Sequence, residues 1–200
     1  MKRLGQYAMF AILLSVAPRA RAGGDDPAWN LIKVHSSVGF SVKHLLISKV
    51  RGTFADFDGT VRAAKDGRIS RFEGIVKTAS VDTGNAKRDE HLRSPDFFAS
   101  ETFPTITAKT TRITWDGDRF VAATDLTIKG ITRSVLLAGE LLGTRVANFG
   151  DGDAVFAGYS FSTTINRKDF GLNFDKAVNG TAVVDDKVEL TGELEISLTR

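Results

Sequence analysis

Apolar and polar residues alternate along most of the chain. The clearest case is 188–198, where every second residue is apolar or Gly and the residues between are polar. Val38, Phe40 and Val42 repeat the pattern earlier. Two further segments keep the pattern except at one Thr each. In the first, at 120–128, the apolar positions are Phe120, Ala122, Leu126 and Ile128. In the second, at 155–165, they are Val155, Ala157, Tyr159, Phe161 and Ile165. Because successive side chains of a strand point to opposite faces of a sheet, this period of two predicts strands with one buried and one solvated face.

Turn-forming dipeptides separate these segments from further strand-like runs at 52–63, 69–81, 105–115 and 131–144. The dipeptides are Asp66-Gly67, Asp116-Gly117, Lys129-Gly130, Asp151-Gly152 and Asn179-Gly180. Asn-Gly and Asp-Gly favour the tight turns that join antiparallel strands. The runs are therefore predicted to form hairpins.

One segment, 85–100, lacks the alternation. Ser94 suits the N-cap of a helix and Pro95 suits its first position, so we expect one or two short helical turns here. About eight strands with one helical insertion predict an all-β fold, and closing the sheet removes its exposed edges. We expect an extended eight-stranded antiparallel β-barrel, with a two-sheet sandwich as the alternative.

The first 22 residues have the features of a secretory signal peptide. Basic Lys2 and Arg3 precede an apolar run at 7–16, and Ala20 and Ala22 place small residues at the cleavage-site positions. A permanent membrane span needs roughly 20 apolar residues, so this run is too short to be one. The sequence predicts a signal peptide at 1–22, a flexible start at 23–28 and one domain at 29–200, in a periplasmic or secreted protein.

The net charge of +3 at pH 7 comes from this leader. The leader holds four basic residues and no acidic one, which leaves 23 basic and 24 acidic residues in the rest of the chain. A nearly neutral domain has no polybasic surface, so nucleic acid is not expected as a partner, and binding to an anionic membrane is disfavoured as well. The aromatic residues are mostly Phe rather than the Trp and Tyr of membrane-barrel girdles, so we expect the apolar face to lie inside a soluble barrel.

Sequence patterns for catalysis and metal binding are absent. The chain has no Cys, which excludes a thiolate nucleophile and Cys-ligated zinc. His35 and His44 lie nine residues apart, which would place them on opposite faces of an uninterrupted strand. No nucleophile elbow, H-E-x-x-H helix or P-loop is present. We expect neither an enzyme nor a metal site, although a His–acid pair that meets only in the folded chain stays the enzymatic alternative.

The chain contains 14 Phe residues, all but Phe10 after the leader. A buried ring contributes roughly 1.5–3 kcal/mol, so core packing alone can account for most of them. An eight-stranded barrel can also enclose a ligand cavity, which Phe side chains would line. Glycines within the strand runs indicate bulges, close backbone approaches or room for a ligand, and they are Gly39, Gly74, Gly139, Gly158 and Gly192.

Several charged residues lie among apolar ones in the irregular segments, namely Arg88, Asp89, Asp96, Arg167 and Asp169. They either fix loops through ion pairs or form a polar clamp at the mouth of a cavity. Arg suits the clamp, because its guanidinium group binds anionic or carbonyl head groups.

Six motifs follow one another through the domain. They are His35-Ser36-x-x-Gly39-Phe40-x-Val42-x-His44, Gly52-x-Phe54-x-x-Phe57-x-Gly59, Thr83-x-x-x-x-Arg88-Asp89-x-His91-Leu92-x-Ser94-x-Asp96-Phe97-Phe98, Phe103-Pro104-x-Ile106, Leu126-Thr127-Ile128-Lys129-Gly130-Ile131-Thr132 and Ile165-Asn166-Arg167-Lys168-Asp169-Phe170-Gly171. In this order and spacing, over essentially all of 29–200, they resemble the YceI-like family of secreted bacterial polyisoprenoid-binding proteins.

The resemblance implies a lipocalin-like barrel that holds a long apolar polyisoprenoid or another lipid, for transport or storage. Proteins similar to this one are periplasmic or secreted, often dimeric, and not known as enzymes. No cofactor is expected beyond the bound isoprenoid or lipid, and a homodimer is compatible with the resemblance. The alternative is a non-enzymatic stress or interaction module with a packed barrel and a protein partner.

The expected ligand-binding residues fall into two groups. We hypothesise that the tunnel is lined by Phe40, Phe54, Phe72, Leu126, Ile128 and Phe161, and that Arg88 or Arg167 meets the head group. Carried over by motif position, the resemblance adds residues that shape the barrel and its mouth, among them His44, Phe97, Phe98 and Phe170.

Overall fold

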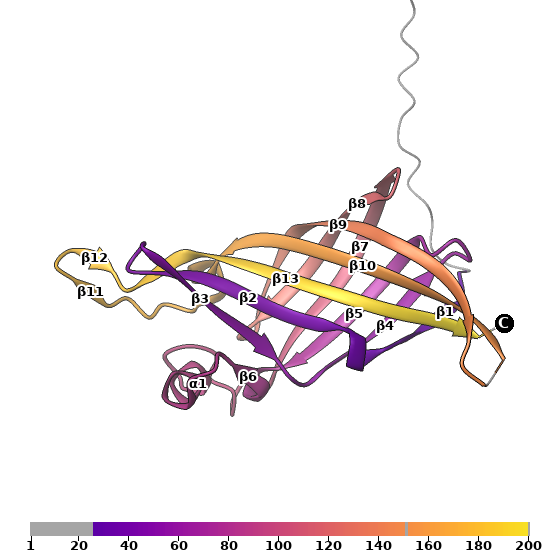
Figure 1. Ribbon diagram of the computed structural model, residues 1–200. Helices are drawn as coiled ribbons and strands as arrows, with labels where there is room; N and C mark the ends of the chain where they lie inside the picture. Colours follow the sequence, from indigo (N-terminus) through magenta and orange to yellow (C-terminus); the bar gives the residue numbers. More distant parts are fainter. Residues whose placement is uncertain (1–25, 151, 200) are drawn as a thin grey trace, which may run out of the picture.

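A long antiparallel barrel forms the body of the protein, as Figure 1 shows for this computed structural model. The structure describes residues 26–150 and 152–199. The predicted signal peptide at 1–22 and residues 23–25 of the predicted flexible start lie outside the described residues. Ala28, the last residue of that start, already belongs to the first strand and pairs with Arg62, because the buried Trp29 beside it anchors the strand.

Strands make up most of the described chain, and its helices are short. The strands are β1 (Ala28–Leu31), β2 (Ser37–His44), β3 (Ser48–Phe54), β4 (Phe57–Ala63), β5 (Ile69–Lys77), β6 (Val81–Asp82), β7 (Thr105–Asp116), β8 (Arg119–Ile128), β9 (Ile131–Asn148), β10 (Asp153–Asn166), β11 (Ala177–Val178), β12 (Thr181–Ala182) and β13 (Val184–Thr199). The helices are α1 (Ala86–Arg93) and the 3-10 helices η1 (Lys33–His35), η2 (Thr78–Ser80) and η3 (Arg167–Phe170).

The main sheet closes into a ring of eight strands. The order β1-β4-β5-β7-β8-β9-β10-β13 returns to β1, because the two edges of β13 pair with β10 and β1. β2 pairs with the first half of β13, on the same edge as β1, and β3 and β6 extend the sheet from there. The pairings are antiparallel, so the predicted eight-stranded antiparallel barrel is confirmed and the sandwich is wrong.

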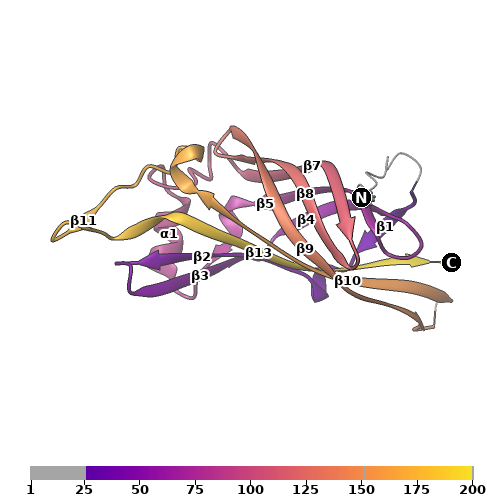
Figure 2. The ribbon, with the colours of Figure 1, turned by 90° about the horizontal axis from the view of Figure 1, so that it is seen from above.

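The run 52–63 forms two strands rather than the single one that its alternation suggests. β3 ends at Phe54 and β4 begins at Phe57, and between them the chain changes its partner from β2 to β5. The backbone N–H groups of Ala55 and Asp56 donate to Ser80 instead of to a strand. The 3-10 helix η1 likewise separates β1 from β2, which pair with the same edge of β13. These two breaks let β2 and β3 leave the ring as an extension at one end (Figure 2).

The predicted helical insertion is present, but its predicted start at Ser94 is wrong. Helix α1 begins at Ala86, and the Asn85 side chain caps it by accepting a hydrogen bond from the Arg88 N–H (3.1 Å). Ser94 is instead the C-cap, with an extended ψ of 169°. The following Pro95 explains this outcome, because proline disfavours helical geometry in the residue before it.

The two ends of the barrel differ in packing. We call them the β1 end, which carries β1 and the C-terminus of β13, and the α1 end, which carries α1, the β2–β3 turn and the β11–β12 hairpin (Figures 1 and 2). A cluster of thirteen buried apolar residues fills the β1 end, with Val61, Tyr159 and Ile196 all below 2% exposed. The cluster at the α1 end has six, namely Phe97, Leu126, Ile128, Ile165, Phe170 and Leu172.

Phenylalanine rings lie over glycines of neighbouring strands. Phe161 in β10 lies opposite Gly139 on one side and Gly192 on the other, and a Cβ at Gly192 would overlap its ring. Phe120 covers Gly139 in the same way. An aromatic ring over a strand glycine restores the packing that the missing side chain would give. The surroundings of the strand glycines differ by position: rings cover Gly74, Gly139 and Gly192, backbone approaches Gly39, and Gly158 lies at a bulge. Gly39 and Gly74 also line a cavity, so for these two the alternative of room for a ligand stays open.

Candidate ligand-binding site

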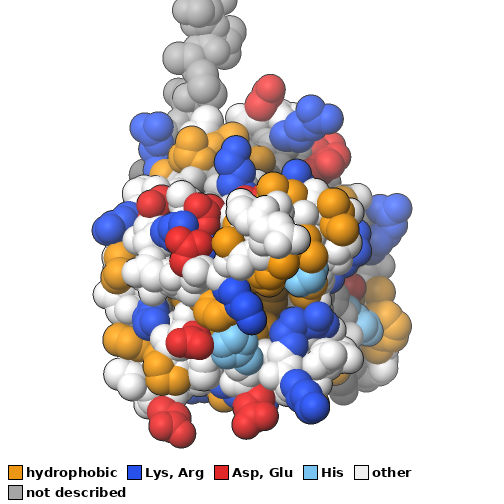
Figure 3. Space-filling model, turned by 90° about the vertical axis from the view of Figure 1, so that its left-hand side faces the viewer, with side chains coloured by type: hydrophobic (Ala, Val, Ile, Leu, Met, Phe, Trp, Pro, Cys, Tyr) orange, Lys and Arg blue, Asp and Glu red, His pale blue; other side chains and the backbone are white. Residues whose placement is uncertain are grey.

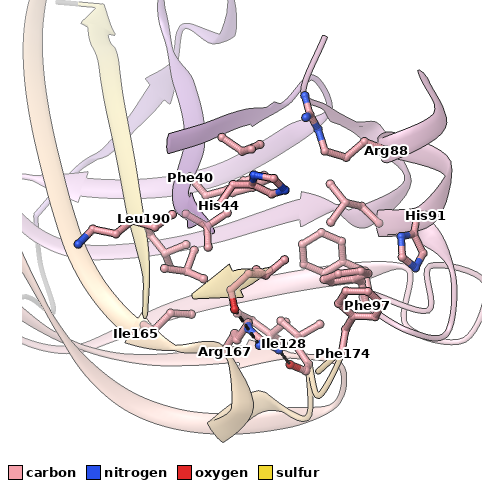
Figure 4. Close-up of a pocket in the computed structure, with 18 of the residues that line it drawn as sticks. Phe40, His44, Arg88, His91, Phe97, Ile128, Ile165, Arg167, Phe174 and Leu190 are labelled. Atoms are coloured by element: carbon pink, nitrogen blue, oxygen red, sulfur yellow. Dashed lines mark hydrogen bonds between the residues drawn. The ribbon is translucent and has the colours of Figure 1, made fainter. Parts of the chain in front are cut away.

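A cavity of about 400 Å³, which we call the outer cavity, lies inside the α1 end. Side chains from β2, β3 and β13 and from α1 and the segment after it form part of its walls (Figure 4). Another part comes from residues 172–184, the segment between η3 and the start of β13 that contains the β11–β12 hairpin and that we call the excursion. Sixteen of its 22 lining residues are apolar. The lining also includes the exposed Lys43, His91 and Lys176, so the cavity reaches the surface. Its volume lies in the range of small-molecule sites, roughly 300–1,000 Å³.

A second space of about 100 Å³, the inner cavity, continues the outer cavity toward the β1 end. The two share four lining residues, Phe54, Ile106, Ile128 and Leu190. Phe72 and Phe161, with ring centroids 6.4 Å apart, lie at the far side of the inner cavity. Beyond these rings only about 20 Å³ is left, next to Tyr159. The combined space therefore runs along the barrel and ends at the two rings.

The polar side chains that line the outer cavity are all of basic residues. They are Lys43, His44, Arg88, His91, Arg167 and Lys176. Asp and Glu are absent from this lining. A site with basic groups at one end and apolar walls elsewhere is complementary to a molecule with an anionic or hydrogen-bond-accepting head and an apolar body.

Arg167 fixes the excursion of the chain between β10 and β13. Its side chain is only 3% exposed. The guanidinium group donates to the carbonyl oxygens of Leu172 (2.5 Å) and Val184 (3.3 Å), two residues that line the cavity (Figure 4). It also donates to the Asp185 carbonyl oxygen (3.0 Å) and to Oδ1 of Asp186 (2.9 Å). Most of its donors are thus used within the chain. Of the two roles expected for the charged residues, the hydrogen bonds of Arg167 fit that of holding a loop.

Arg88 and Asp89 hold α1 against β6 through Thr83. Arg88 donates from Nε to the Thr83 hydroxyl (2.7 Å) and from Nη2 to the Thr83 carbonyl (2.9 Å). The buried Asp89 carboxylate accepts from the Thr83 N–H (2.9 Å) and hydroxyl (2.5 Å). The Thr83–Arg88–Asp89 motif therefore fixes the helix at the cavity edge, and the Arg88 side chain lines the outer cavity beside it.

An aromatic cluster connects α1 with the segment at 172–184, and both of these line the outer cavity. The His91 ring, on α1, lies nearly perpendicular to the Phe97 and Phe174 rings, at centroid distances of 5.0 and 5.1 Å. His91 Nε2 also lies 2.9 Å from Asp96 Oδ2, which orients the ring. Phe174 belongs to the excursion at 172–184, so this cluster connects α1 to the opposite wall.

Most of the predicted site residues lie along these cavities. The outer cavity is lined by Phe40, His44, Phe54, Arg88, Phe97, Phe98, Ile128 and Arg167, and the inner cavity by Phe54, Phe72, Leu126, Ile128 and Phe161. Phe170 lines neither of them; it is 1% exposed within the buried cluster of the α1 end. Contact between any of these residues and a ligand stays a prediction.

The structure adds lining residues that the sequence reasoning missed. Val188 and Leu190 carried a usable signal, since both belong to the alternating segment at 188–198. Phe174, Lys176 and Val183 carried none, because they lie in a stretch without regular periodicity. Their place in the wall depends on the path of the excursion that Arg167 holds.

Two pKa shifts reflect the contrast between the closed interior and the surface. Burial raises the pKa of Tyr159 well above its ordinary value, with the nearby Asp66 charge as a smaller cause, and the phenol donates to the Gly67 carbonyl (2.5 Å). On the surface at the α1 end, the Ser41 hydroxyl and then the Lys49 ammonium group lower the pKa of Glu189.

Within residues 26–150 and 152–199, we find no group of three or more His, Cys, Asp or Glu side chains placed to hold a metal ion. In the same part of the chain, no helix has the length and apolar character needed to cross a membrane. His35 Nδ1 contacts Glu195 Oε1 (3.2 Å) whereas His44 lines the outer cavity, so these two histidines do not converge.

A closed antiparallel barrel with an apolar cavity open at one end defines the class of ligand-binding β-barrels. Residues 29–196 match the YceI-like domain, and the chain belongs to the YceI-like family. The resemblance seen in the sequence motifs is thereby confirmed.

Relatives of known sequence and structure agree with this assignment. A UPF0312 protein of Staphylococcus aureus is 39% identical over 171 residues, which cover 82% of this chain and 94% of the relative. The crystal structure of a Campylobacter jejuni YceI protein superposes with a TM-score of 0.67 at 30% identity, over 86% of this chain and 98% of that one. A polyisoprenoid binding domain from Saccharophagus degradans shares the fold, with a TM-score of 0.57 at 15% identity over 84% and 97% of the two chains.

Proposed function

We propose that this protein is an exported, non-enzymatic carrier or store that holds a long apolar polyisoprenoid or similar lipid inside its barrel. The observation that carries the proposal is the apolar outer cavity of about 400 Å³ and its continuation into the inner cavity. Burial of an apolar chain contributes roughly 25 cal/mol for each Å² removed from water, without specific hydrogen bonds. The polyisoprenoid binding domain of the same fold supports this ligand class.

The head group would lie at the basic rim of the outer cavity. Lys43, His44 and Lys176 are on the rim, and Arg88 has guanidinium donors beyond those that Thr83 accepts. This arrangement favours a phosphate, carboxylate or carbonyl head over a cationic one. The bound lipid is the only non-protein component in the proposal.

The proposed alternative, an interaction module with a packed barrel, receives less support. A protein whose barrel serves only as a scaffold would fill it with side chains, as at the β1 end, where only about 20 Å³ is left. The outer cavity instead leaves space for a ligand.

The first test is native mass spectrometry of the protein purified after export, followed by organic extraction and identification of the lipid. We expect a stoichiometric isoprenoid or another long-chain lipid. A protein that is empty and also fails to take up added isoprenoids or fatty amides would contradict the proposal.

Two variants of one strand make a matched pair for this test. Ile128→Trp adds volume where the two cavities meet, whereas Val121→Trp adds the same ring type on the outer face of β8, at a residue 46% exposed. Only the first should lower lipid occupancy. If Ile128→Trp does not fold, Phe161→Trp at the end of the inner cavity replaces it, and a shift toward shorter bound chains is expected. An unchanged chain-length preference in a folded Phe161→Trp protein would show that the ligand does not reach that ring.

A further inference from the structure

The turn between β2 and β3 exposes apolar side chains at the extremity of the α1 end. Leu46 is 54% and Ile47 is 85% exposed. Val178, on the neighbouring β11–β12 hairpin, is 48% exposed. Figures 1 and 2 show both hairpins projecting at this end, and the Leu45 N–H donates to the Val183 carbonyl (3.0 Å), which joins them. We call Leu46, Ile47 and Val178 the apolar tip.

The residues of the β2–β3 turn are unsuited to its geometry. The Ile47 N–H donates to the His44 carbonyl (3.1 Å), and the two residues between have positive φ, 50° at Leu45 and 62° at Leu46. Such a turn favours Asn and Gly, as at Asn179-Gly180 between β11 and β12. Leucine is strained in this conformation, and at position 46 more than half of the residue is exposed, so burial offsets little of that strain. Residues that neither suit the turn nor are well buried do not serve folding, and such positions are expected at functional sites.

Although the domain is nearly neutral as a whole, two basic side chains lie next to the apolar tip, Lys43 before the β2–β3 turn and Lys176 beside Val183. Lys43 and Lys176 are exposed and form no ion pair with any residue that the structure describes. The acidic side chains of this end are partly neutralised by ion pairs within the chain: Glu189 with Lys49, Asp175 with Lys168, and Asp186 with Arg167 and Lys168. Figure 3 looks onto this end and shows hydrophobic side chains beside Lys, Arg and His side chains around a hollow.

We propose that the apolar tip inserts into the surface of an anionic phospholipid bilayer, with Lys43 and Lys176 at the level of the lipid head groups. Exposed apolar side chains combined with nearby cations are the elements of interfacial membrane binding. Lys43 and Lys176 also line the outer cavity, so docking at the tip places the cavity opening against the bilayer. Surface docking goes beyond lipid holding, because a storage protein needs no contact with a membrane.

A Trp substituted at the tip gives a local readout of insertion. Ile47→Trp replaces the most exposed tip residue, and Phe149→Trp is its matched control, on the β9–β10 turn at the β1 end, where Phe149 is 84% exposed. With vesicles of phosphatidylglycerol and phosphatidylcholine, we expect a blue shift of the emission and quenching by brominated lipid for Ile47→Trp only. An unshifted Ile47→Trp spectrum, or equal quenching of both variants, would overturn the proposal.

Loss-of-function variants test the apolar and the basic parts separately. Leu46→Gly with Ile47→Ser should lower vesicle binding about tenfold or more, because two apolar side chains are removed. Folding stability should be retained, because Gly suits the positive φ. Lys43→Gln and Lys176→Gln should each lower binding to anionic vesicles about fivefold, and added salt should reduce the difference. Unchanged binding of the Leu46→Gly/Ile47→Ser protein would contradict insertion.

Two further measurements separate this proposal from its alternatives. Isoprenoid uptake from detergent by Leu46→Gly/Ile47→Ser should equal that of the parent protein, so lost docking with intact uptake distinguishes the tip from the cavity. Light scattering without lipid should give the same mass for both proteins. A dimer that this substitution dissociates would show that the tip binds a second copy of the chain, and the bilayer proposal would fail.

Discussion

At the β1 end the inward side chains meet across the barrel, whereas at the α1 end they leave about 400 Å³ between them. Both ends are built from strands with the same apolar alternation, and β10 and β13 run through both. At the β1 end, Trp29 and Tyr159 fill the space between small residues such as Ala122 and Ala157, all of them below 5% exposed. The inward residues of the α1 end are no smaller; most are Val, Leu, Ile and Phe.

The cavity therefore arises from the path of the backbone rather than from the size of the side chains. The breaks at η1 and at Ala55-Asp56 let β2 and β3 leave the ring, and α1 with the excursion at 172–184 covers the widened end. These two segments are held by the polar contacts of Arg88, Asp89 and Arg167 together with the aromatic cluster around His91, whereas the β1 end depends on apolar packing. Substitutions that distinguish these two sources of stability test the comparison.

The largest effect is expected at Arg167. Arg167→Ala leaves the Leu172, Val184 and Asp185 carbonyl oxygens without their buried donor, and we expect a loss of about 3–5 kcal/mol in the free energy of unfolding. Urea denaturation followed by circular dichroism measures it. Lys168→Ala, at the neighbouring and half-exposed position, is the control and should cost well under about 1 kcal/mol. A folded and stable Arg167→Ala protein that only binds lipid more weakly would assign Arg167 to the ligand instead.

Apolar truncation at the two ends should separate stability from binding. Ile196→Ala, at a fully buried position of the β1 end, should cost about 3 kcal/mol and leave lipid uptake unchanged. Leu190→Ala, on the same strand but facing the cavities, should cost about 1 kcal/mol because its surroundings are already incompletely packed, and should weaken uptake. Thermal melts and isoprenoid titration measure the two properties. Equal stability losses at both positions would contradict a difference in packing between the ends.

The difference between the two ends also explains which features of the fold and of the site could be predicted from the sequence. Alternation along 188–198 identified a strand whose inward residues Val188 and Leu190 line the cavity, since period two depends only on local geometry. The segment 85–100, which lacks the alternation, predicts the helical insertion, but the predicted start at Ser94 is wrong because Asn85 caps the helix instead. The β2–β3 turn carried no turn signal, since Leu45 and Leu46 are residues that such turns avoid. The walls from 172–184 depend on long-range hydrogen bonds of Arg167, which no local pattern encodes.

A smaller effect is expected where a ring covers a glycine at the boundary between the two ends. In Gly192→Ala the new methyl group overlaps the Phe161 ring, which must turn toward the inner cavity. We expect a loss of about 2 kcal/mol from overpacking and a preference for shorter bound chains. Gly158→Ala is the matched control, because only Leu142 approaches its added carbon, at 3.9 Å. If both variants match the parent in stability and chain length, the ring does not limit the cavity.

The smallest effect, and the one most specific to the β1 end, depends on pH. Tyr159→Phe removes the hydrogen bond to the Gly67 carbonyl and should cost about 1 kcal/mol at pH 8. Because burial raises the pKa of Tyr159 in the folded protein, the unfolded chain releases its phenol proton first, at about pH 10. The contribution of the neutral phenol is therefore complete below pH 10 and decreases as the pH rises above it, so the parent loses stability there relative to Tyr159→Phe. Urea denaturation of both proteins between pH 8 and about pH 11 measures the difference, which should shrink with rising pH. A constant difference would mean that Tyr159 ionises equally in both states, and hence that the folded β1 end does not shield its phenol from water.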